Sequence, residues 1–331
     1  MLFKTFSKHL LPAYACVVFS CGAYGQAPQS FDISGVQRLT NQEVVLRLSV
    51  PPGRYRLESA GNLPEWSGLV TFPTNPTGSL VYTDSAAPYL DARYYRAVQL
   101  EDAQVVAGDH LVTTNGDVVM QPRNHATFVM HWDGKMIYND PVPTASYSGL
   151  PKADLILISH SHGDHFSTTS IDAVKGPGAI IIAPKTVYSL LTASQKSNAI
   201  VLGYTSTNVT TTNVLGLTVE AVYAANSNHS PPGFGNGYVI TLGGKRIYIS
   251  GDTGNAPEIR ALTNIDVAFL CMNLPYTMTV SEATNVVRAM RPKVVYPYHY
   301  QDQSGSTANA AAFKKQLGTD PGIEVRLRKW Y

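Results

Sequence analysis

The chain has 331 residues, and its charges nearly balance, with 25 Lys and Arg against 23 Asp and Glu. This length suggests two domains once an N-terminal leader is set aside. The leader holds two lysines and no acidic residue, so the remaining chain carries 23 charges of each sign. A neutral protein creates no field that would attract nucleic acid, and we expect no such partner.

Residues 1–25 follow the pattern of a signal peptide. Two lysines precede an apolar run over residues 10–21, and small residues follow at the positions that a signal peptidase reads. We predict an exported protein, periplasmic or secreted, without a transmembrane span, because no apolar stretch is long enough to cross a bilayer. In the alternative interpretation Cys21 is the lipidated residue of a lipoprotein. The Phe at position 19 favours simple cleavage.

Residues 31–104 predict a small all-β sandwich. Short β patterns near residues 44–48, 55–58, 80–83 and 93–98 alternate with turns rich in Pro, Gly and Asn. The segment from Glu58 to Trp66 resembles the fibronectin-III-like modules of secreted bacterial proteins. As far as Leu100 the segment contains no His or Cys, so we expect an accessory module for anchoring or packing.

Residues 108–331 alternate strands with helices and form the second predicted domain. A capping box at Thr279 and Glu282 opens a helix that should end near Met290, before Pro292. A last helix is expected over residues 308–317 and a last strand over residues 323–327. This order predicts an α+β domain with two sheets covered by outer helices.

A dense group of polar residues follows the apolar strand predicted at residues 155–158. Residues 159–165 read SHSHGDH and place His160, His162, Asp164 and His165 within six positions. Imidazoles and a carboxylate this close together are expensive to bury unless a divalent cation draws them inward. The cluster therefore predicts a metal site, and a metal site favours hydrolysis.

Three further residues occur where the chain leaves or approaches predicted strands. His229 precedes the strand at residues 238–242, Asp252 follows the strand at residues 246–250, and His299 follows the strand at residues 293–298. Each has a β-branched or aromatic run beside it. They are the additional ligands that a second metal ion would need.

Together the seven residues resemble the pattern H-x-H-x-D-H, His, Asp, His of the metallo-β-lactamase-fold hydrolases. The flanking residues 124–127, 140–141, 251–254 and 281–283 look most similar to the branch that includes ascorbate-6-phosphate lactonase and the N-acyl-phosphatidylethanolamine-hydrolysing phospholipase D. The resemblance covers the chain from about Gly108 onward and implies an αββα sandwich. It does not specify the substrate, because this fold carries many hydrolytic reactions.

The resemblance also implies the arrangement of ligands. His160, His162 and His229 would hold one metal ion, Asp164, His165 and His299 would hold the other, and Asp252 would bridge them. Asp164 and Asp252 are also the predicted catalytic residues. We expect Zn²⁺, with Mn²⁺ or Fe as alternatives. A bridging water whose pKa is lowered to near ~7 would supply the attacking hydroxide.

Other polar residues near these motifs receive weaker predictions. His110, His125 and His131 fall outside the pattern, and ordinary hydrogen bonds are expected for them; the less favoured alternative for His125 is that it lines the floor of the site. Asp140 is a candidate acceptor for the second nitrogen of a metal-bound imidazole, with capping of a helix or turn as the alternative. The glycine-rich residues 233–237 could approach a phosphate, but a flexible turn is the favoured interpretation. Cys271 is predicted to be a buried strand residue and not a nucleophile.

The sequence thus predicts an exported two-metal hydrolase that cleaves a phosphodiester, lactone, ester or amide bond in a small-molecule or lipid-like substrate. The near absence of Lys and Arg from the cluster loops mildly favours a neutral substrate, or else leaves recognition of the substrate's charge to the metal ions. The alternative is a catalytically silent, metal-stabilised binding protein whose β-sandwich mediates attachment. Retention of all seven ligands speaks against this alternative.

Overall fold

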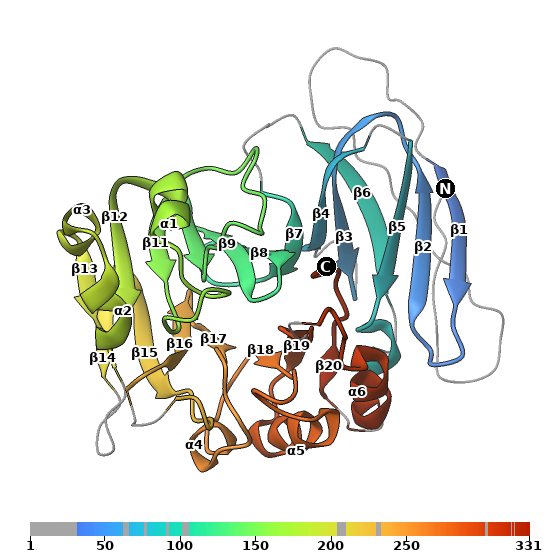
Figure 1. Ribbon diagram of the computed structural model, residues 1–331. Helices are drawn as coiled ribbons and strands as arrows, with labels where there is room; N and C mark the ends of the chain where they lie inside the picture. Colours follow the sequence, from blue (N-terminus) through green and yellow to red (C-terminus); the bar gives the residue numbers. More distant parts are fainter. Residues whose placement is uncertain are drawn as a thin grey trace. The chain divides into compact units, whose positions relative to one another are not determined.

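The computed structural model describes residues 32–61, 66–75, 78–90, 93–100, 106–203, 210–229, 233–301, 304–318, 320 and 322–331 (Figure 1). The predicted signal peptide, including Cys21, lies outside these residues. The chain divides into two compact units: Met1–Val112 with Asp117–Gln121, and Thr113–Gly116 with Pro122–Tyr331. Within the described ranges no helix has the length and apolar character needed to cross a membrane.

In the first unit all strand pairings given by the structure are antiparallel. One sheet has the order β1-β2-β5, and a second group has the order β6-β3-β4-β7. A short 3-10 helix, η1 (Ala87–Tyr89), precedes β6. The strands of this unit are β1 (Asp32–Arg38), β2 (Val44–Ser49), β3 (Gly53–Ala60), β4 (Ser67–Asn75), β5 (Ser79–Asp84), β6 (Tyr94–Leu100) and β7 (Gly108–Leu111), followed by β8 (Val118–Asn124), which continues into the second unit.

Apolar side chains from both groups of strands form the core of the first unit. In β2, Leu46 is fully buried and Arg47 is exposed, as alternation along a strand with one buried face requires. Leu57 of β3, Tyr82 of β5 and Tyr95 of β6 join the same cluster. Packing of this kind is what a small β-sandwich needs, while the likeness to fibronectin-III modules stays a prediction.

The domain boundary between residues 104 and 108 also stays a prediction. The pairing of strand β7 is relevant to where that boundary lies. We assigned Gly108 and the residues after it to the second domain. In the structure β7 pairs with β4 through Val70 and Asp109, and with β8 through Asp109 and Met120. These ladders group β7 with the first unit.

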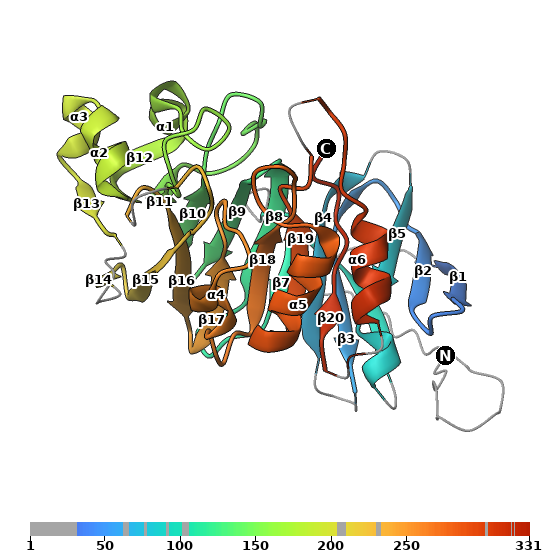
Figure 2. The same ribbon diagram turned by 60° about the horizontal axis from the view of Figure 1, so that its bottom comes forward.

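The second unit contains two sheets (Figure 2). The first has the order β13-β12-β11-β10-β9, and the second has the order β14-β15-β16-β17-β18-β19-β20. The first sheet consists of β9 (Thr127–Trp132), β10 (Lys135–Asn139), β11 (Ala153–Leu157), β12 (Lys175–Ala183) and β13 (Ala199–Val201). The second consists of β14 (Thr211–Val214), β15 (Leu217–Tyr223), β16 (Asn236–Leu242), β17 (Lys245–Ile249), β18 (Val267–Cys271), β19 (Val294–Tyr298) and β20 (Glu324–Val325).

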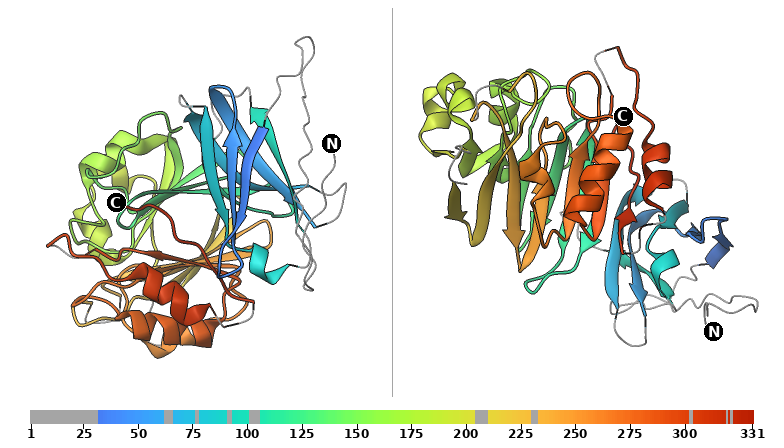
Figure 3. Two further views of the ribbon diagram at one scale, coloured as in Figure 1. Left: turned by 90° about the vertical axis from the view of Figure 1, so that its right-hand side faces the viewer. Right: turned by 90° about the horizontal axis from the view of Figure 1, so that it is seen from below.

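Helices cover the outer faces of these two sheets (Figure 3). Helices α1 (Thr168–Val174), α2 (Lys185–Leu190) and α3 (Ala193–Lys196) lie beside the first sheet, and α4 (Pro257–Arg260), α5 (Val280–Met290) and α6 (Ala310–Leu317) lie beside the second. The capping box predicted at Thr279 and Glu282 opens α5, which ends at Arg291 in the left-handed conformation. The αββα arrangement predicted for this part of the chain is therefore present.

Aromatic side chains fill the space between the two sheets. Phe128 of β9 stacks on Phe269 of β18 with ring centroids 4.2 Å apart, and Trp330 meets both rings edge-on. Tyr238 of β16 donates its hydroxyl hydrogen bond to the carbonyl of Ile158, just after β11. This dry interior holds the sheets in register, so loops that leave their strands at one edge keep fixed positions.

Candidate metal centre

The seven predicted ligands come together at one edge of the two sheets of the second unit. The loop between β11 and α1 carries His160, His162, Asp164 and His165. Strands β10 and β11 run parallel, as do β17, β18 and β19, so the residues that follow them emerge on the same side. Asp252 and His299 therefore approach from the second sheet, and His229 reaches the same place from the loop before β16.

The first group of ligand atoms belongs to His160, His162 and His229. One ring nitrogen from each of the three lies within 4.8 Å of the other two. Nε2 of His160 is 3.0 Å from Nδ1 of His162, and the ring centroids of His160 and His229 are 4.4 Å apart. His160 and His229 are completely buried. This is the set that we predicted for one metal ion.

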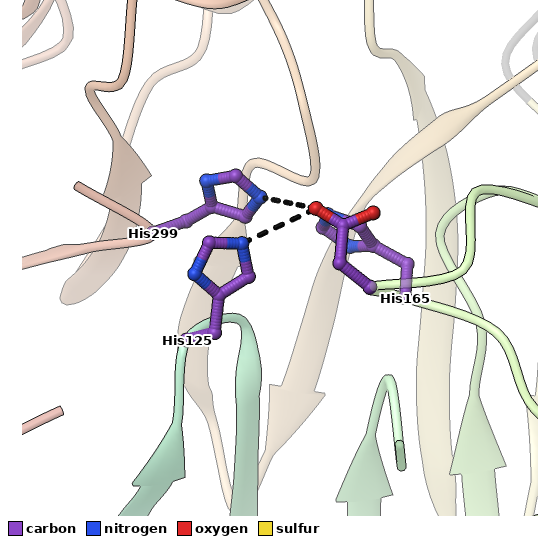
Figure 4. Close-up of side chains that lie close together, drawn as sticks. His125, His165 and His299 are labelled. Carbon is purple, nitrogen blue, oxygen red and sulfur yellow. Dashed lines mark hydrogen bonds and ion pairs between the residues drawn. The ribbon is translucent and has the colours of Figure 1, made fainter. Parts of the chain in front are cut away.

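The second group contains Asp164, His165 and His299, and also His125. Nε2 of His299 lies 3.5 Å from Oδ2 of Asp164. The rings of His165 and His299 are stacked, with centroids 4.9 Å apart. Figure 4 shows His125, His165 and His299 converging from different parts of the chain.

Asp252 lies between the two groups. Its Oδ1 atom is 3.3 Å from Nε2 of both His165 and His299, while its Oδ2 atom is 3.9 Å from Nε2 of His160. It thus contacts residues of both predicted metal sites, which is the position that a bridging carboxylate would need.

Several buried polar atoms at this centre have no hydrogen-bond partner among the described residues. They are Nε2 of His165, Nε2 of His229, Oδ1 of Asp252 and both ring nitrogens of His299. The 3.3 Å approaches to Asp252 lack hydrogen-bond geometry, so they do not satisfy these atoms. Buried polar groups without partners are costly and rare. Imidazole nitrogens and carboxylate oxygens converging in this way fit divalent cations such as Zn²⁺.

Hydrogen bonds behind the ligands fix which imidazole nitrogen faces the centre. Asp140, fully buried at the end of β10, accepts from Nδ1 of His165 at 2.8 Å. Nδ1 of His229 donates to the carbonyl of Ala224 at 2.8 Å. Both contacts leave Nε2 pointing inward, which is how protein partners orient metal-binding histidines. Asp140 therefore makes the contact that our hypothesis required.

Ser159 provides a further contact that the sequence did not reveal to us. Its hydroxyl is 2.7 Å from Oδ2 of Asp140 and 2.9 Å from Nδ1 of His160, and its backbone N–H donates to Oδ1 of Asp140. Because the hydroxyl has one proton and the carboxylate must receive it, the oxygen accepts from Nδ1 of His160. Nε2 of His160 is then available at the centre.

The pKa values of the buried groups at the centre shift in different directions. Burial lowers the pKa of His160 and of His229, which keeps both imidazoles neutral. Burial alone would raise the pKa of Asp252, but the imidazoles of His299 and His165 outweigh it and hold that pKa well below its usual range. Burial would lower the pKa of His165, but the carboxylates of Asp252 and Asp140 raise it. Asp252 is thus ionised and can act as a ligand, whereas a metal ion would have to displace a proton from His165.

His125 follows the less favoured of our two expectations. It makes hydrogen bonds, but one of them is at the centre: its Nε2 lies 3.2 Å from Oδ2 of Asp164, and its ring centroid is 3.7 Å from that of His299. The predicted ligands after strands end their strands, whereas His125 precedes β9, which runs antiparallel to β10. The start of β9 therefore lies at the same edge as the end of β10. His110 does make ordinary hydrogen bonds, to Thr71 and Asp117 in the first unit.

The glycines at 233–237 serve close packing. A Cβ atom on Gly235 would lie 2.9 Å from Nδ1 of His229 and 3.1 Å from Cβ of His160. A Cβ atom on Gly237 would meet the carbonyl oxygens of Ile249 and Ser250 at 2.9 Å. Contact with the imidazoles and with the neighbouring strand explains these two glycines without a phosphate.

A cavity of about 990 Å³ opens beside the centre. His162, Asp164, Asp252 and His299 form part of its wall, so the ligands face the space that a substrate would fill. The described residues that line it include no Lys or Arg. Its other polar side chains include the amides of Asn124, Asn228 and Gln301 and the phenols of Tyr276 and Tyr331, together with His125 and Thr144.

Comparisons with known proteins agree with this geometry. Residues 121–299 match the family model described as the beta-lactamase superfamily domain. The chain belongs to this superfamily. This beta-lactamase superfamily protein is 29% identical to a UPF0173 metal-dependent hydrolase of Pyrococcus abyssi over 61% of its own length and 92% of that relative. A second UPF0173 protein of the same organism is 32% identical, over 58% of this chain and 87% of the relative.

Solved structures give the same result. A crystal structure described as a metal-dependent hydrolase of Parabacteroides distasonis is 37% identical, with a TM-score of 0.59, and covers 68% of this chain and 99% of its own. The metallo hydrolase Igni18 of Ignicoccus hospitalis, at 24% identity and a TM-score of 0.54, shares the fold over 64% of this chain and 95% of its own. The protein is a metal-dependent hydrolase, which confirms the predicted enzyme class; its branch within the superfamily stays a prediction.

Proposed function

We propose that this hydrolase works with two divalent metal ions, most simply Zn²⁺, with Mn²⁺ or Fe as alternatives. His160, His162 and His229 would hold one ion, Asp164, His165 and His299 the other, and Asp252 both. The observation that carries the proposal is the set of unpartnered buried nitrogen and oxygen atoms, which falls into two groups joined through Asp252. When bound, the cations would lower the pKa of a water to near ~7 and stabilise negative charge on the reacting group.

The chain's own residues would prepare the site. Asp140, Ser159 and the carbonyl of Ala224 hold the imidazoles in the required tautomers before any metal binds. Most ligands are buried, whereas the side chain of Asp164 is 49% exposed. Asp164 therefore borders the cavity and is the ligand most open to an incoming substrate.

The cavity favours an uncharged carbonyl substrate, such as a lactone, ester or amide, over a phosphodiester. A phosphate is usually held by Arg or Lys side chains, and the described lining offers none. Amide and phenol groups instead suit hydroxyl, carbonyl or amide groups on the substrate. A volume of about 990 Å³ admits a small molecule with a substantial non-reacting part, including a lipid-like one.

Reconstitution of the metal-free protein would test this proposal. We expect two equivalents of Zn²⁺ to bind per chain, and turnover of neutral lactones, esters or amides in a panel that also contains phosphodiesters. Binding of a single ion would refute the two-metal site. Efficient turnover of phosphodiesters alone would refute the substrate class, and full metal occupancy without turnover of any member would favour the silent binding protein.

We also propose that the protein is exported and that its β-sandwich is an accessory module. The support is the leader pattern of residues 1–25 and the lack of His and Cys in residues 31–100. Sequencing the N-terminus of the protein recovered from the periplasm or medium should reveal cleavage after residue 25. Incorporation of labelled fatty acid that is lost on Cys21→Ser would instead establish the lipoprotein.

A further inference from the structure

Asp164 is the most exposed of the seven predicted ligands; His162 is half-buried, and the other five are buried. The Asp164 side chain is 49% exposed, whereas those of His165 and His299 are 0% and 1% exposed. A carboxylate at the surface can rotate among several conformers unless hydrogen bonds hold it. The nearest donor outside the seven ligands is His125, whose Nε2 lies 3.2 Å from Oδ2 of Asp164.

His125 is in turn held by Tyr331, which is 206 positions away in the chain. Nδ1 of His125 is 2.9 Å from the Tyr331 hydroxyl oxygen. The same oxygen accepts hydrogen bonds from the backbone N–H groups of Tyr300 and Gln301, each at 3.1 Å. The Tyr331 side chain thus links the residues that follow His299 to His125.

The hydrogen bonds around the Tyr331 hydroxyl determine which nitrogen of His125 carries the proton. A phenolic oxygen has two lone pairs and one proton. The two backbone N–H groups occupy the lone pairs, so the hydroxyl proton must point to Nδ1 of His125. Burial raises the pKa of Tyr331, which keeps that proton in place. Nε2 of His125 then carries the hydrogen and donates it to Asp164.

We propose that Tyr331 and His125 are positioning residues, and that the hydrogen-bond chain Tyr331–His125–Asp164 holds the Asp164 carboxylate in its metal-binding orientation. This inference rests on the proposed two-metal function. It assigns His125 as a donor to a ligand, although its nitrogen is close enough to the second group to be a ligand itself. A protonated Nε2 cannot bind a metal, so the Tyr331 hydroxyl decides between the two roles.

The backbone conformation of His125 and His299 also indicates that the surrounding structure fixes their positions. His125 and His299 have φ angles of 54° and 45°, which are uncommon for residues other than glycine. The N–H of His299 donates to the carbonyl of His125, and the N–H of His125 donates to the carbonyl of Trp330. Such conformations persist where the surroundings over-determine them, often at functional sites.

Nuclear magnetic resonance of the ¹⁵N-labelled, metal-free protein tests the tautomer directly. We expect His125, assigned by the loss of its signals in His125→Gln, to carry its proton on Nε2 in the wild type. In Tyr331→Phe the Nδ1-protonated form should become populated. The matched control, Tyr300→Phe, removes a hydroxyl from a ring 5.1 Å from that of Tyr331 and should leave the tautomer unchanged. A wild-type His125 protonated on Nδ1 would overturn the proposal.

Zinc titration tests the consequence for the metal. Loss of a partner behind a ligand typically costs about 10–100-fold in metal affinity or activity. We expect Tyr331→Phe to weaken the second Zn²⁺ equivalent by that factor while leaving the first equivalent unchanged, and Tyr300→Phe to match the wild type. Equal weakening of both equivalents, or of neither, would contradict a role specific to Asp164. Thermal melting of each variant separates these outcomes from unfolding.

Steady-state kinetics separates positioning from substrate contact, because Tyr331 also lines the cavity. Positioning predicts a kcat lowered about 10–100-fold with KM changed less than about twofold. A rise in KM alone would make Tyr331 a substrate contact and overturn the proposal. His125→Gln, which can still donate to Asp164, should retain more activity than His125→Leu. If the protein binds only one metal ion, the proposed function fails, yet the tautomer measurement still reports on the hydrogen-bond chain.

Discussion

Two buried histidines, one in each unit, have similar surroundings but differ in the hydrogen bonding of their second ring nitrogen. In the first unit His110 lies between Asp117, 2.7 Å from Nδ1, and Thr71, 2.8 Å from Nε2. In the second unit His165 has Asp140 2.8 Å from Nδ1, but its Nε2 has no hydrogen-bond partner. Both rings lie beside a carboxylate and both are buried.

The difference lies in the second nitrogen. His110 has both ring nitrogens hydrogen-bonded, one to Asp117 and one to Thr71, which is 1% exposed, so neither nitrogen is left for a metal ion. The unpartnered nitrogen of His165 instead points at other unpartnered atoms beside a cavity. Unpartnered buried atoms therefore distinguish the candidate site from the surroundings of His110, where both ring nitrogens have partners. The following variants test this distinction, beginning with the largest expected effect.

Asp252→Asn should have the largest effect, because Asp252 contacts both ligand groups. We expect kcat/KM to fall by more than about 100-fold, beyond the usual loss for an outer partner, and both metal equivalents to weaken. Activity assays and metal analysis after dialysis would measure this. Asp117→Asn, which alters the carboxylate beside His110, is the matched control and should retain metal and activity. Loss of metal from Asp117→Asn would contradict the proposed difference between His110 and His165.

Asp140→Asn should have an intermediate effect. The amide can no longer accept hydrogen bonds at both of its terminal atoms, so His165 loses a firm orientation. We expect metal affinity to fall about 10–100-fold, measured by competition with a chelator. Asp266→Asn removes a carboxylate that accepts from Lys293 and the backbone of Arg246, away from the centre. Unchanged affinity in Asp140→Asn, or an equal loss in Asp266→Asn, would remove Asp140 from the metal site.

Thr71→Val should change stability and not catalysis. It leaves Nε2 of His110 without a partner in a buried position, which costs about 1–3 kcal/mol. Denaturant unfolding should show that loss in the free energy of unfolding, while kcat, KM and metal content stay at wild-type values. A changed kcat would show that the first unit contributes to the chemistry.

A thiol reagent should have the smallest effect of all, because the Cys271 thiol is buried and hydrogen-bonded. Burial raises the pKa of its thiol to about 12, and Sγ lies 3.5 Å from the N–H and 3.4 Å from the carbonyl of Thr253. At pH 8 the reactive thiolate is therefore scarce. We expect no reaction with a disulfide reagent in the folded protein and full reaction after denaturation. Rapid labelling of the folded protein would indicate an opening of β18.

The convergence of the candidate ligands was predictable from the sequence where they follow parallel strands. His160, Asp252 and His299 each lie after an apolar strand, and parallel strands bring such residues to one edge. The place of His125 was the less favoured alternative because it precedes an antiparallel strand, and the same edge receives the starts of such strands. Tyr331 was missed for another reason: its contact with His125 spans 206 positions, and no local pattern reports it.

For the fold too, local signals were predictable from the sequence, whereas long-range strand pairing was not. The capping box of α5 is a local signal and fixed the start of that helix. The grouping of β7 was less accessible because it depends on pairing with β4, about 40 positions earlier in the chain. Composition and turn residues reveal that strands exist, whereas their partners depend on packing that distant residues provide.

The close fit of Gly235 against two imidazoles has a consequence for directed evolution of this enzyme. Any larger residue at position 235 would push against His229 and His160 and disturb the metal site before it changed substrate preference. A mutant library should therefore keep this glycine constant. Its diversity is better placed at Asn228, Tyr276 and Gln301, where new side chains can reshape the cavity wall.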